Sequence, residues 1–310
     1  MNEISSAAKA LVAGKLVAFP TETVYGLGAN AESESAVARV YKTKGRPADH
    51  PLIVHIASQD QMTNWASTVP EYAIALAEAY WPGPMTLILE RSKLANDFVT
   101  GNQNSVGLRV PNHPVALELL KAFTELGGKG IAAPSANRFG KVSPTTAKAV
   151  SDELGEFMEP GDMILDGGFS EVGIESTIID CRGDAPKILR PGSITIEMIE
   201  KATNLSLDET ESTLRVSGAL DNHYSPKAQV LLDQPPLIGD GFIAMANVET
   251  PEGAIRLASP QTLDEFARVL YQSLRDADSQ LLTRVVVWQP IGNGLAIAIR
   301  DRLRRASNKG

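Results

Sequence analysis

Apolar positions in the first two-thirds of the chain follow two different spacings, which predict helices and strands in an irregular order. A spacing of three to four residues is typical of one face of a helix, and short continuous apolar runs are typical of buried strands. We expect helices at residues 4–13, 33–42, 72–80, 114–126, 145–154 and 194–202. We expect strands at residues 16–20, 52–56, 85–90, 105–110, 130–134, 163–166, 176–180 and 187–190. Since several strands follow one another directly, the pattern predicts a mixed-sheet α/β domain.

Capping and turn-forming residues mark the ends of these elements. Ser33 or Ser35 is a candidate N-cap of the second helix. The run of Trp, Pro, Gly and Pro at residues 81–84 stops the third helix. Residues 21–28 contain two glycines and are predicted to form a turn. No Gly-Lys-Ser/Thr follows them, so this segment is not a phosphate-binding loop of that type.

A change in composition after residue 203 predicts a linker and a second unit. Residues 204–228 are polar and lack long apolar runs, as expected of a linker. The linker ends with His223, Tyr224 and Lys227, a combination for which a plain spacer has little need. Beyond it we expect strands at residues 230–232, 242–246 and 285–288 and helices at residues 262–276 and 295–305. Residues 229–310 are therefore predicted to form a small α/β domain.

Composition narrows the classes of protein to which the chain can belong. With 310 residues, 43% of them hydrophobic, it can bury one large core or two modest ones. Its net charge of −8 argues against a surface that coats duplex nucleic acid. The single cysteine, Cys181, excludes an internal disulfide and a multi-thiolate metal site. No apolar run reaches the ~18 residues of a membrane span, and Glu3 and Lys15 are unlike a secretory signal. We expect a cytoplasmic protein without membrane contact.

Basic residues crowd one short stretch that leads into an apolar strand. Lys42, Lys44 and Arg46 are followed by Pro47, which favours an extended backbone at Arg46 and ends the preceding helix. These cations are therefore expected on a loop, where an arginine fork can bind phosphate oxygens in bidentate fashion. The alternative is that they are solvated charges at a helix end, which is the default for any two basic residues.

Small polar residues follow a later buried strand. Ser135, Asn137 and Ser143 come after the strand expected at residues 130–134, and loops at strand ends of α/β sheets often bind ligands. Turn formation explains these side chains equally well. Cations and short hydrogen-bond donors without an obvious nucleophile favour a site that binds phosphates over one that attacks through a side chain.

Arg109 lies inside a short apolar strand, where its charge must be paired. The partner is either an internal carboxylate or an anionic ligand in a cleft, and the sequence favours neither. His50 and His55 are five residues apart, so on a strand they point to opposite faces and cannot bind one metal ion together. We therefore expect no metal-binding residues, zinc ligands included.

Taken together, these segments resemble the YrdC family. The motifs occur in the family's order at residues 20–27, 44–47, 51–55, 81–86, 109–111, 134–137, 175–178 and 190–192. Residues 223–227 and the C-terminal unit are similar to the long two-domain form of the family. The resemblance implies a YrdC-like twisted mixed β-sheet domain with flanking helices at residues 1–203. It further implies a linker or lid at residues 204–228 and a small Rossmann-like α/β domain at residues 229–310.

The resemblance also implies an activity, that of a nucleotidyltransferase. Enzymes of this kind combine L-threonine, bicarbonate and ATP, with Mg²⁺ bound to the ATP, into threonylcarbamoyl-adenylate and pyrophosphate. A partner enzyme, a threonylcarbamoyl transferase, then modifies an adenosine beside the tRNA anticodon, so contact with tRNA is expected to be indirect. The linker is expected to fold over the site and keep water from a labile mixed anhydride.

Roles for individual residues follow from the same resemblance. Lys44 and Arg46 would be the catalytic cations. The threonine site would be formed by Thr23, His55, Arg109, Ala133 and Ser176. The nucleotide site would be formed by Lys44, Arg46, His50, Ser105, Ser135, Asn137, Ser143, Arg190 and Tyr224. His50 stands where the family often has Asn, and Ser105 where it often has Thr, but both can form hydrogen bonds.

Two other functions stay open at the level of the sequence. One is a carbamoyl-adenylate synthase, as in YrdC-like domains of hydrogenase maturation factors, although the chain lacks the Cys-rich segment that accompanies those domains. The other is an RNA-binding module without catalysis, against which the net charge of −8 argues.

Overall fold

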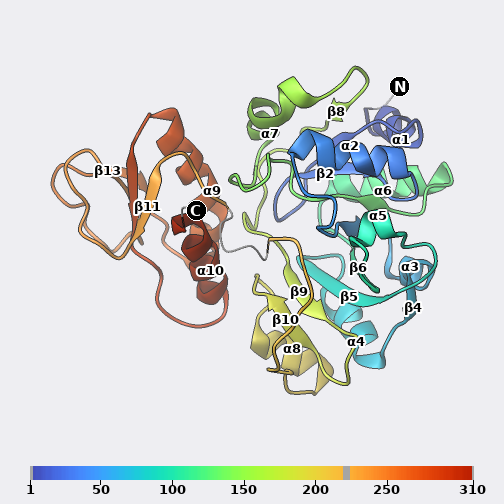
Figure 1. Ribbon diagram of the computed structural model, residues 1–310. Coiled ribbons are helices and arrows are strands. Elements are labelled where there is room, and N and C mark those ends of the chain that lie inside the picture. Colours follow the sequence, from blue (N-terminus) through green and yellow to red (C-terminus); the bar gives the residue numbers. More distant parts are fainter. Residues whose placement is uncertain (1–2, 219–223, 309–310) are drawn as a thin grey trace.

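Helices and strands form where the apolar spacing predicts them over most of the chain. The computed structural model describes residues 3–218 and 224–308 (Figure 1). The helices are α1 (Glu3–Val12), α2 (Glu34–Lys44), α3 (Met62–Trp65), α4 (Glu71–Tyr80), α5 (Asp97–Thr100), α6 (Pro114–Glu125), α7 (Ala147–Leu154), α8 (Ile196–Thr203), α9 (Leu263–Ser279) and α10 (Leu295–Ser307). The strands are β1 (Val17–Phe19), β2 (Gly26–Asn30), β3 (Ile53–His55), β4 (Ala66–Thr68), β5 (Met85–Arg91), β6 (Ser105–Arg109), β7 (Ile131–Ala132), β8 (Met163–Ile164), β9 (Thr177–Asp180), β10 (Lys187–Arg190), β11 (Gln229–Leu232), β12 (Gly241–Ile243), β13 (Ile255–Ala258) and β14 (Arg284–Val287). In the part of the chain that the structure covers, none of these helices combines the length and apolar character needed to cross a bilayer.

Among the described residues, a ten-stranded mixed sheet forms the centre of the first domain. Its strands lie in the order β10-β9-β5-β6-β3-β7-β2-β1-β8, and β4 pairs with β5. The pairs β3–β6, β5–β9 and β1–β8 are parallel, and the other pairs are antiparallel. The predicted mixed sheet is therefore confirmed.

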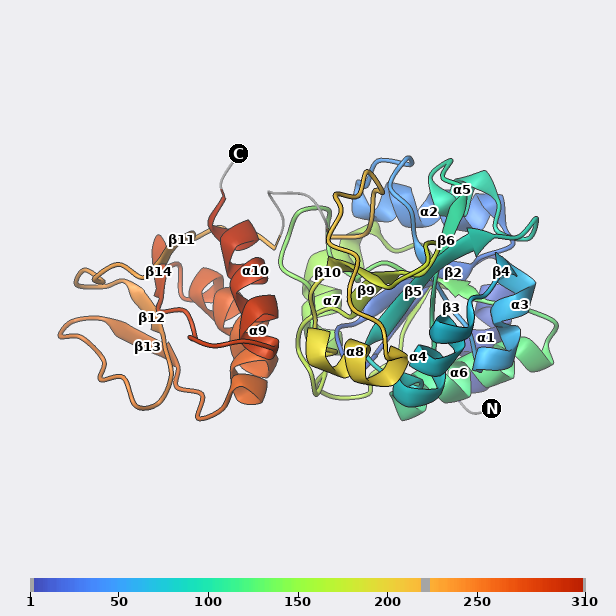
Figure 2. The same ribbon diagram turned by 90° about the horizontal axis from the view of Figure 1, so that it is seen from below.

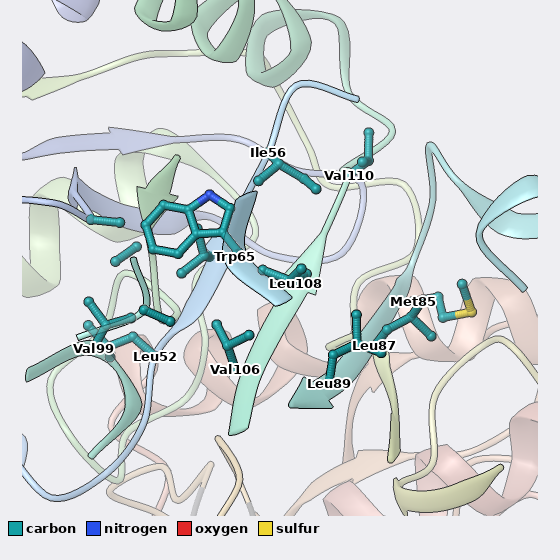
Figure 3. Packing of buried hydrophobic residues seen from close by; sticks show 14 of the residues in the cluster. Leu52, Ile56, Trp65, Met85, Leu87, Leu89, Val99, Val106, Leu108 and Val110 are labelled. Carbon is teal, nitrogen blue, oxygen red and sulfur yellow. The ribbon is translucent and has the colours of Figure 1, made fainter. Parts of the chain in front are cut away.

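Side chains of alternate strand residues pack on both faces of this sheet. In β1, Val17 and Phe19 pack with residues of α1 and α6, whereas Ala18 belongs to the cluster on the opposite face. Trp65 is fully buried in that second cluster, and Figure 3 shows it there with Leu108 of β6. Because apolar packing occupies both faces, the ends of the strands are left for polar chemistry.

The helix α2 is longer than expected, and its length changes the setting of the basic residues. It runs to Lys44 and ends at Gly45, whose φ of 64° lies in the left-handed region that glycine adopts readily. Lys42 and Lys44 therefore lie in the helix and not on a loop as expected, because the left-handed glycine cap ends the helix at Lys44 instead of at residue 42. Arg46 does follow the cap.

The glycine-rich segment that we expected to be a turn ends in a strand. β2 begins at Gly26 and pairs with β1 and β7. A Cβ atom at Gly28 would lie 2.7 Å from Cγ2 of Ile131 and 2.8 Å from Cε1 of Phe19. Glycine is required at position 28 because side chains of the neighbouring strands lie so close to it.

The strand β13 in the second domain also lies outside the strands that the sequence predicts.

The second domain is built on a parallel sheet. In the residues described after the linker, its strands lie in the order β11-β14-β12-β13. Both views show α9 and α10 between this sheet and the first domain (Figures 1 and 2). Their apolar faces pack on Val230, Ile243 and Val285, and the far face of the sheet carries Phe242 and Val286. This arrangement agrees with the predicted Rossmann-like unit. It also places α9 and α10 on the side of the sheet that faces the first domain.

The segment that joins the domains crosses the first domain before it reaches the second. Val216 packs with Ile178 of β9 in a small apolar cluster. Arg215 forms an ion pair with Asp49 at 2.8 Å. This part of the linker is therefore held against the large sheet and is no free spacer. His223, which the sequence singles out, lies outside the described residues.

Candidate active site

Strand ends and the linker enclose a pocket at one end of the large sheet. β3 and β6 are parallel and place His55 beside Arg109 at their carboxyl ends. The directions of β5, β9 and β10 bring Ser176, just before β9, and Arg190, at the end of β10, to the same end. The pocket is open to solvent at its mouth. It is lined by Thr21, Thr23, Val24, Tyr25, Gly26, Ile53, His55, Arg109, Ala133, Pro134, Ser135, Glu175, Ser176, Arg190, Ser217, Gly218 and Tyr224.

This pocket brings together residues from both predicted binding sets. The threonine set lines it with Thr23, His55, Arg109, Ala133 and Ser176. The nucleotide set lines it with Ser135, Arg190 and Tyr224. The predicted residues outside the lining are Lys44, Arg46, His50, Ser105, Asn137 and Ser143. The threonine set thus forms one continuous surface, whereas the nucleotide set is divided between the pocket and its surroundings.

Arg109 has the internal carboxylate that one of the two alternatives requires. Its Nη2 atom lies 2.8 Å from Oε1 of Glu22, and it also lines the pocket. Sequence reasoning missed Glu22, although its position between Thr21 and Thr23 in the first motif was a usable signal. Burial and then the charge of Arg109 lower the pKa of His55 to about 3, so the imidazole is neutral near pH 7. The pocket therefore presents a paired cation beside a neutral histidine.

Arg190 fixes the backbone that carries Ser176. Its Nε and Nη2 atoms donate to the Ser176 carbonyl at 3.1 and 2.8 Å, and Nη2 also donates to Ser176 Oγ at 3.2 Å. The same hydroxyl lies 2.8 Å from Oγ1 of Thr86. The Nη1 atom of Arg190 donates to the carbonyl of Ser217 at 2.8 Å. One arginine thus couples a pocket wall to the linker.

Lys44 and Asn137 hold the loop that follows β7. The Nζ atom of Lys44 donates to the carbonyls of Ser135 and Asn137 at 2.6 and 2.5 Å. The side-chain amide of Asn137 donates to two further carbonyls of the same loop at 2.7 and 2.8 Å. Burial and then the nearby charge of Arg46 lower the pKa of Lys44 well below its ordinary value. These contacts make both residues supports of the loop that carries Ser135.

Arg46 and His50 flank Phe139, an aromatic residue that sequence reasoning missed. The guanidinium of Arg46 lies 5.8 Å from the ring centroid, and His50 packs edge-on at 5.4 Å. The Nη2 atom of Arg46 also donates to the carbonyl of Pro51 at 3.0 Å, and burial lowers the pKa of this arginine to about 10. Ser105 lines a neighbouring hollow together with Ile53 and Ser217, which also line the pocket. Arg46, His50 and Ser105 therefore lie outside the lining of the pocket.

Glu175 connects the pocket to the C-terminal domain, and sequence reasoning gave it no role. It accepts hydrogen bonds from the hydroxyl groups of Ser143 at 2.6 Å and Tyr271 at 2.8 Å, and from Nε of Arg302 at 2.8 Å. Burial raises the pKa of its carboxyl group, but Arg302, Arg190 and these hydrogen bonds outweigh burial and hold the pKa at about 2. No local pattern marks Tyr271 or Arg302, because each sits on an amphipathic helix.

Tyr224 closes the pocket from the side of the linker. Its φ of 63° is in the left-handed region, and its ring stacks on Tyr271 with centroids 5.5 Å apart and planes 25° apart. Gly218 lies against it so closely that a Cβ atom at that position would collide with the Tyr224 hydroxyl. Burial and then the charge of Glu175 raise the pKa of Tyr224 to about 12, so the phenol stays protonated near pH 7.

The arrangement suits the binding of anionic small molecules. Arg109 and Arg190 supply cations, small hydroxyls supply hydrogen bonds, and the residues that line the pocket include no cysteine. Within residues 3–218 and 224–308, no three His, Cys, Asp or Glu side chains gather as a metal site would require. Fold and pocket together define a mixed-sheet α/β protein whose pocket is lined by the first domain and the linker, with a basic and polar lining suited to anions.

Comparison with known proteins gives the family. The family model described as "Telomere recombination", for the Sua5, YciO and YrdC proteins, matches residues 9–192. The model described as "Threonylcarbamoyl-AMP synthase, C-terminal domain" matches residues 194–308. The chain therefore belongs to the YrdC family, in the two-domain form that carries this C-terminal domain.

Similarity to individual relatives extends over both domains. The threonylcarbamoyl-AMP synthase of Pyrococcus abyssi is 40% identical over 315 residues, which cover 95% of this chain and 91% of the relative. The threonylcarbamoyl-AMP synthase of Bacillus subtilis is 35% identical over 328 residues, which cover 98% and 93%. The crystal structure of P. abyssi Sua5 complexed with L-threonine matches with a TM-score of 0.87 at 37% identity, covering 98% of this chain and 94% of that one. The predicted two-domain α/β fold is thus confirmed.

Proposed function

We propose that the chain is a nucleotidyltransferase that forms L-threonylcarbamoyladenylate and pyrophosphate from L-threonine, bicarbonate and ATP. The observation that carries this proposal is the full-length similarity to threonylcarbamoyl-AMP synthases, together with the match to a structure that contains L-threonine. The chemistry of the pocket supports it, because the nucleophile comes from the substrates. The threonine amine and bicarbonate condense to a carbamate with loss of water, and a carbamate oxygen attacks the α-phosphorus of ATP and displaces pyrophosphate. The protein therefore has only to bind and orient anions.

In this proposal threonine binds where β3 and β6 end. Arg109 binds the carboxylate of threonine, and the hydroxyls of Thr23 and Ser176 offer hydrogen bonds. Neutral His55 adds a hydrogen bond without repelling the ammonium group, and Ala133 supplies a small apolar surface. The pocket lining supports this set, since all five residues belong to it.

ATP then occupies the part of the pocket near the loop and the linker. We propose that its binding surface comprises Lys44, Arg46, His50, Ser105, Ser135, Asn137, Ser143, Arg190 and Tyr224. Lys44 and Arg46 are the proposed catalytic cations. Lys44 fixes the loop that carries Ser135, and Arg46 offsets the negative charge that develops on the phosphates during attack.

Mg²⁺ enters with ATP in this proposal. Glu175 in the pocket wall pairs with Arg302, and Glu22 beside the pocket pairs with Arg109, so neither carboxylate is proposed as a metal ligand. Mg²⁺ keeps several waters and needs few protein ligands, so the triphosphate oxygens can hold it. When bound, it offsets phosphate charge.

The product implies a second enzyme. We propose that a threonylcarbamoyl transferase moves the threonylcarbamoyl group to the adenosine next to the tRNA anticodon. Both reactions would take place in the cytoplasm, where ATP and tRNA are present. Contact of this chain with tRNA would be indirect, in keeping with the net charge of −8.

The test is pyrophosphate release from ATP by the purified protein with bicarbonate and Mg²⁺, with and without L-threonine. We expect release that depends on threonine. Arg46→Ala should abolish it while the circular dichroism spectrum stays unchanged. Lys42→Ala removes an exposed cation from the same stretch and should keep full activity. Turnover retained in Arg46→Ala would remove that arginine from catalysis.

The same assay separates the two other functions. Release triggered by carbamoyl phosphate in place of threonine would identify a carbamoyl-adenylate synthase. Salt-dependent binding of tRNA without consumption of ATP would identify an RNA-binding module.

A further inference from the structure

The acidic residue of the pocket is held by the second domain. Glu175 lies directly before Ser176, lines the pocket and is 7% exposed. Its Oε2 atom accepts hydrogen bonds from Tyr271 and Arg302, each at 2.8 Å, and its Oε1 atom accepts one from Ser143 at 2.6 Å. Tyr271 belongs to α9 and Arg302 to α10, the helices that face the first domain (Figure 2). The second domain therefore supplies the partners of a residue in the pocket wall.

Arg302 contacts two pocket-bearing segments at once. Its Nη2 atom donates to the carbonyls of Glu175 at 3.3 Å and Pro191 at 3.0 Å. Glu175 precedes Ser176 at the start of β9, and Pro191 follows Arg190 at the end of β10. The Arg302 side chain is fully buried, and its Nη1 atom donates to a carboxylate of its own helix at 2.7 Å. One side chain thus sets the spacing of the segments that carry Ser176 and Arg190.

Tyr271 supports the wall formed by the linker. Its ring stacks on Tyr224, and the guanidinium of Arg302 lies 5.6 Å from the centroid of the Tyr224 ring. Tyr224 itself lines the pocket. The same two residues of the second domain therefore contact both Glu175 and the linker wall.

The charge of Glu175 gives this arrangement a consequence for binding. Threonine carries a carboxylate and ATP carries phosphates, and a wall carboxylate without a counter-charge would repel both. Arg302 supplies that counter-charge from 2.8 Å. A buried ion pair contributes little to stability relative to apolar packing of the same volume. Charge balance and geometry at the pocket are therefore the better explanation of the pair.

We propose that Arg302 and Tyr271 are positioning residues of the active site. They set the place and the charge balance of Glu175, and through Glu175 they fix Ser143, Ser176 and the neighbouring end of β10. The second domain is then a working part of the pocket. This proposal rests on the proposed function, because the residues that it positions are those expected to bind threonine and ATP.

The kinetic test compares Arg302→Met with Arg300→Met. Arg300 lies on the same helix but donates to the carbonyls of Pro290 and Gly292 within its own domain, at 2.8 and 2.9 Å. We expect Arg302→Met to raise KM for ATP and for threonine about tenfold, with a smaller change in kcat. Arg300→Met should stay within about twofold of the wild type.

A double variant separates charge balance from simple support. Glu175→Gln combined with Arg302→Met removes the repelling carboxylate together with its partner, so both KM values should return to within about threefold of the wild type. A purely structural role for Arg302 predicts no recovery, and the absence of recovery would overturn the charge-balance part of the proposal.

Tyr271→Phe covers the case in which Arg302→Met does not fold. It keeps the ring that stacks on Tyr224 and removes only the hydroxyl that donates to Glu175. We expect KM for ATP to rise about threefold. KM values unchanged in Tyr271→Phe, and in every Arg302 variant that folds, would overturn the proposal.

Amide hydrogen exchange makes the test independent of activity. Peptides that contain residues 174–178 and 190–192 should exchange about tenfold faster in Arg302→Met than in the wild type or in Arg300→Met. Faster exchange in a protein without threonine-dependent release would support the positioning and contradict the proposed function. Unchanged exchange would overturn the positioning, whatever the activity of the wild type.

Discussion

Arg109 shows what a charge inside an apolar strand requires. The sequence indicates that it must be paired and leaves the partner open. In the structure, strand register places Arg109 beside His55, and the loop after β1 brings Glu22 to 2.8 Å. Arg109 therefore has a protein carboxylate as its counter-charge and still lines the pocket.

Removing the arginine should separate its two roles. Arg109→Gln leaves Glu22 buried without a counter-charge, so the free energy of unfolding should fall by about 3–5 kcal/mol. The double variant Glu22→Gln/Arg109→Gln should recover most of that stability but no threonine-dependent pyrophosphate release. Urea unfolding and the release assay measure the two quantities. Activity restored in the double variant would contradict a role for Arg109 in threonine binding.

His55 makes stability depend on pH in a defined direction. Its pKa falls from 6.5 to about 3 on folding, so the unfolded chain binds a proton that the folded chain does not. The stabilisation is fully present above pH 6.5 and is lost as the pH falls toward 3, by up to about 1.4 kcal/mol per pH unit. Urea unfolding at about pH 7 and pH 5 should show this slope, and His55→Gln should flatten it. Equal slopes would show that His55 is not held neutral.

For single residues, the sequence predicts which side chains line the pocket better than it predicts which side chains pair with one another. Thr23, His55 and Ser176 could be placed in one site because their motifs occur in the family's order, and all three line the pocket. Glu22 and Glu175 could not be placed in the site, because the role of each carboxylate depends on the arginine with which it pairs. That information lies in the tertiary structure and not in the local spacing.

Among the elements, apolar spacing predicts most helices to within a few residues, and special backbone positions account for the differences. α2 ends at Lys44, beyond the expected end at residue 42, because Gly45 adopts the left-handed cap conformation. β2 is missed because glycine-rich segments usually form turns. Its glycines instead make room for side chains of neighbouring strands, which no single segment of sequence reveals.

An added methyl group at Gly28 tests this account of β2. Gly28→Ala would place Cβ 2.7 Å from Ile131, so the free energy of unfolding should fall by about 1–3 kcal/mol. Gly155→Ala is the matched control, since its Cβ would meet nothing closer than 3.7 Å and its φ of −53° suits alanine. Urea unfolding of both variants gives the comparison. Equal stability of the two would contradict close packing at β2.

For the whole molecule, the sequence predicts two domains but not the contact by which the second domain holds a residue of the pocket wall. Glu175 and Arg302 are 127 residues apart in the chain and hydrogen-bonded in the fold. Arg302 sits on a helix rich in arginine, and nothing in the pattern separates it from the arginines beside it. Only the packing of the second domain against the first shows that Arg302 is the arginine that pairs with Glu175.

Removal of residues 221–310 should therefore disable the pocket while leaving the first domain folded. The truncated chain keeps the large sheet but loses Tyr224 and the partners of Glu175. Threonine-dependent pyrophosphate release should fall by about a hundredfold or more, with the circular dichroism spectrum of the first domain preserved. Full activity in the truncated chain would show that the second domain is not part of the site.

The bond between Glu175 and Arg302 has a consequence for anyone who recombines such proteins. A domain that contains every residue of its active site can be combined with domains of related proteins. In this chain the two domains depend on each other, because a second domain taken from another protein must place an arginine and a tyrosine within hydrogen-bond distance of Glu175. A functional chimera of this chain therefore has to inherit both sides of that contact together.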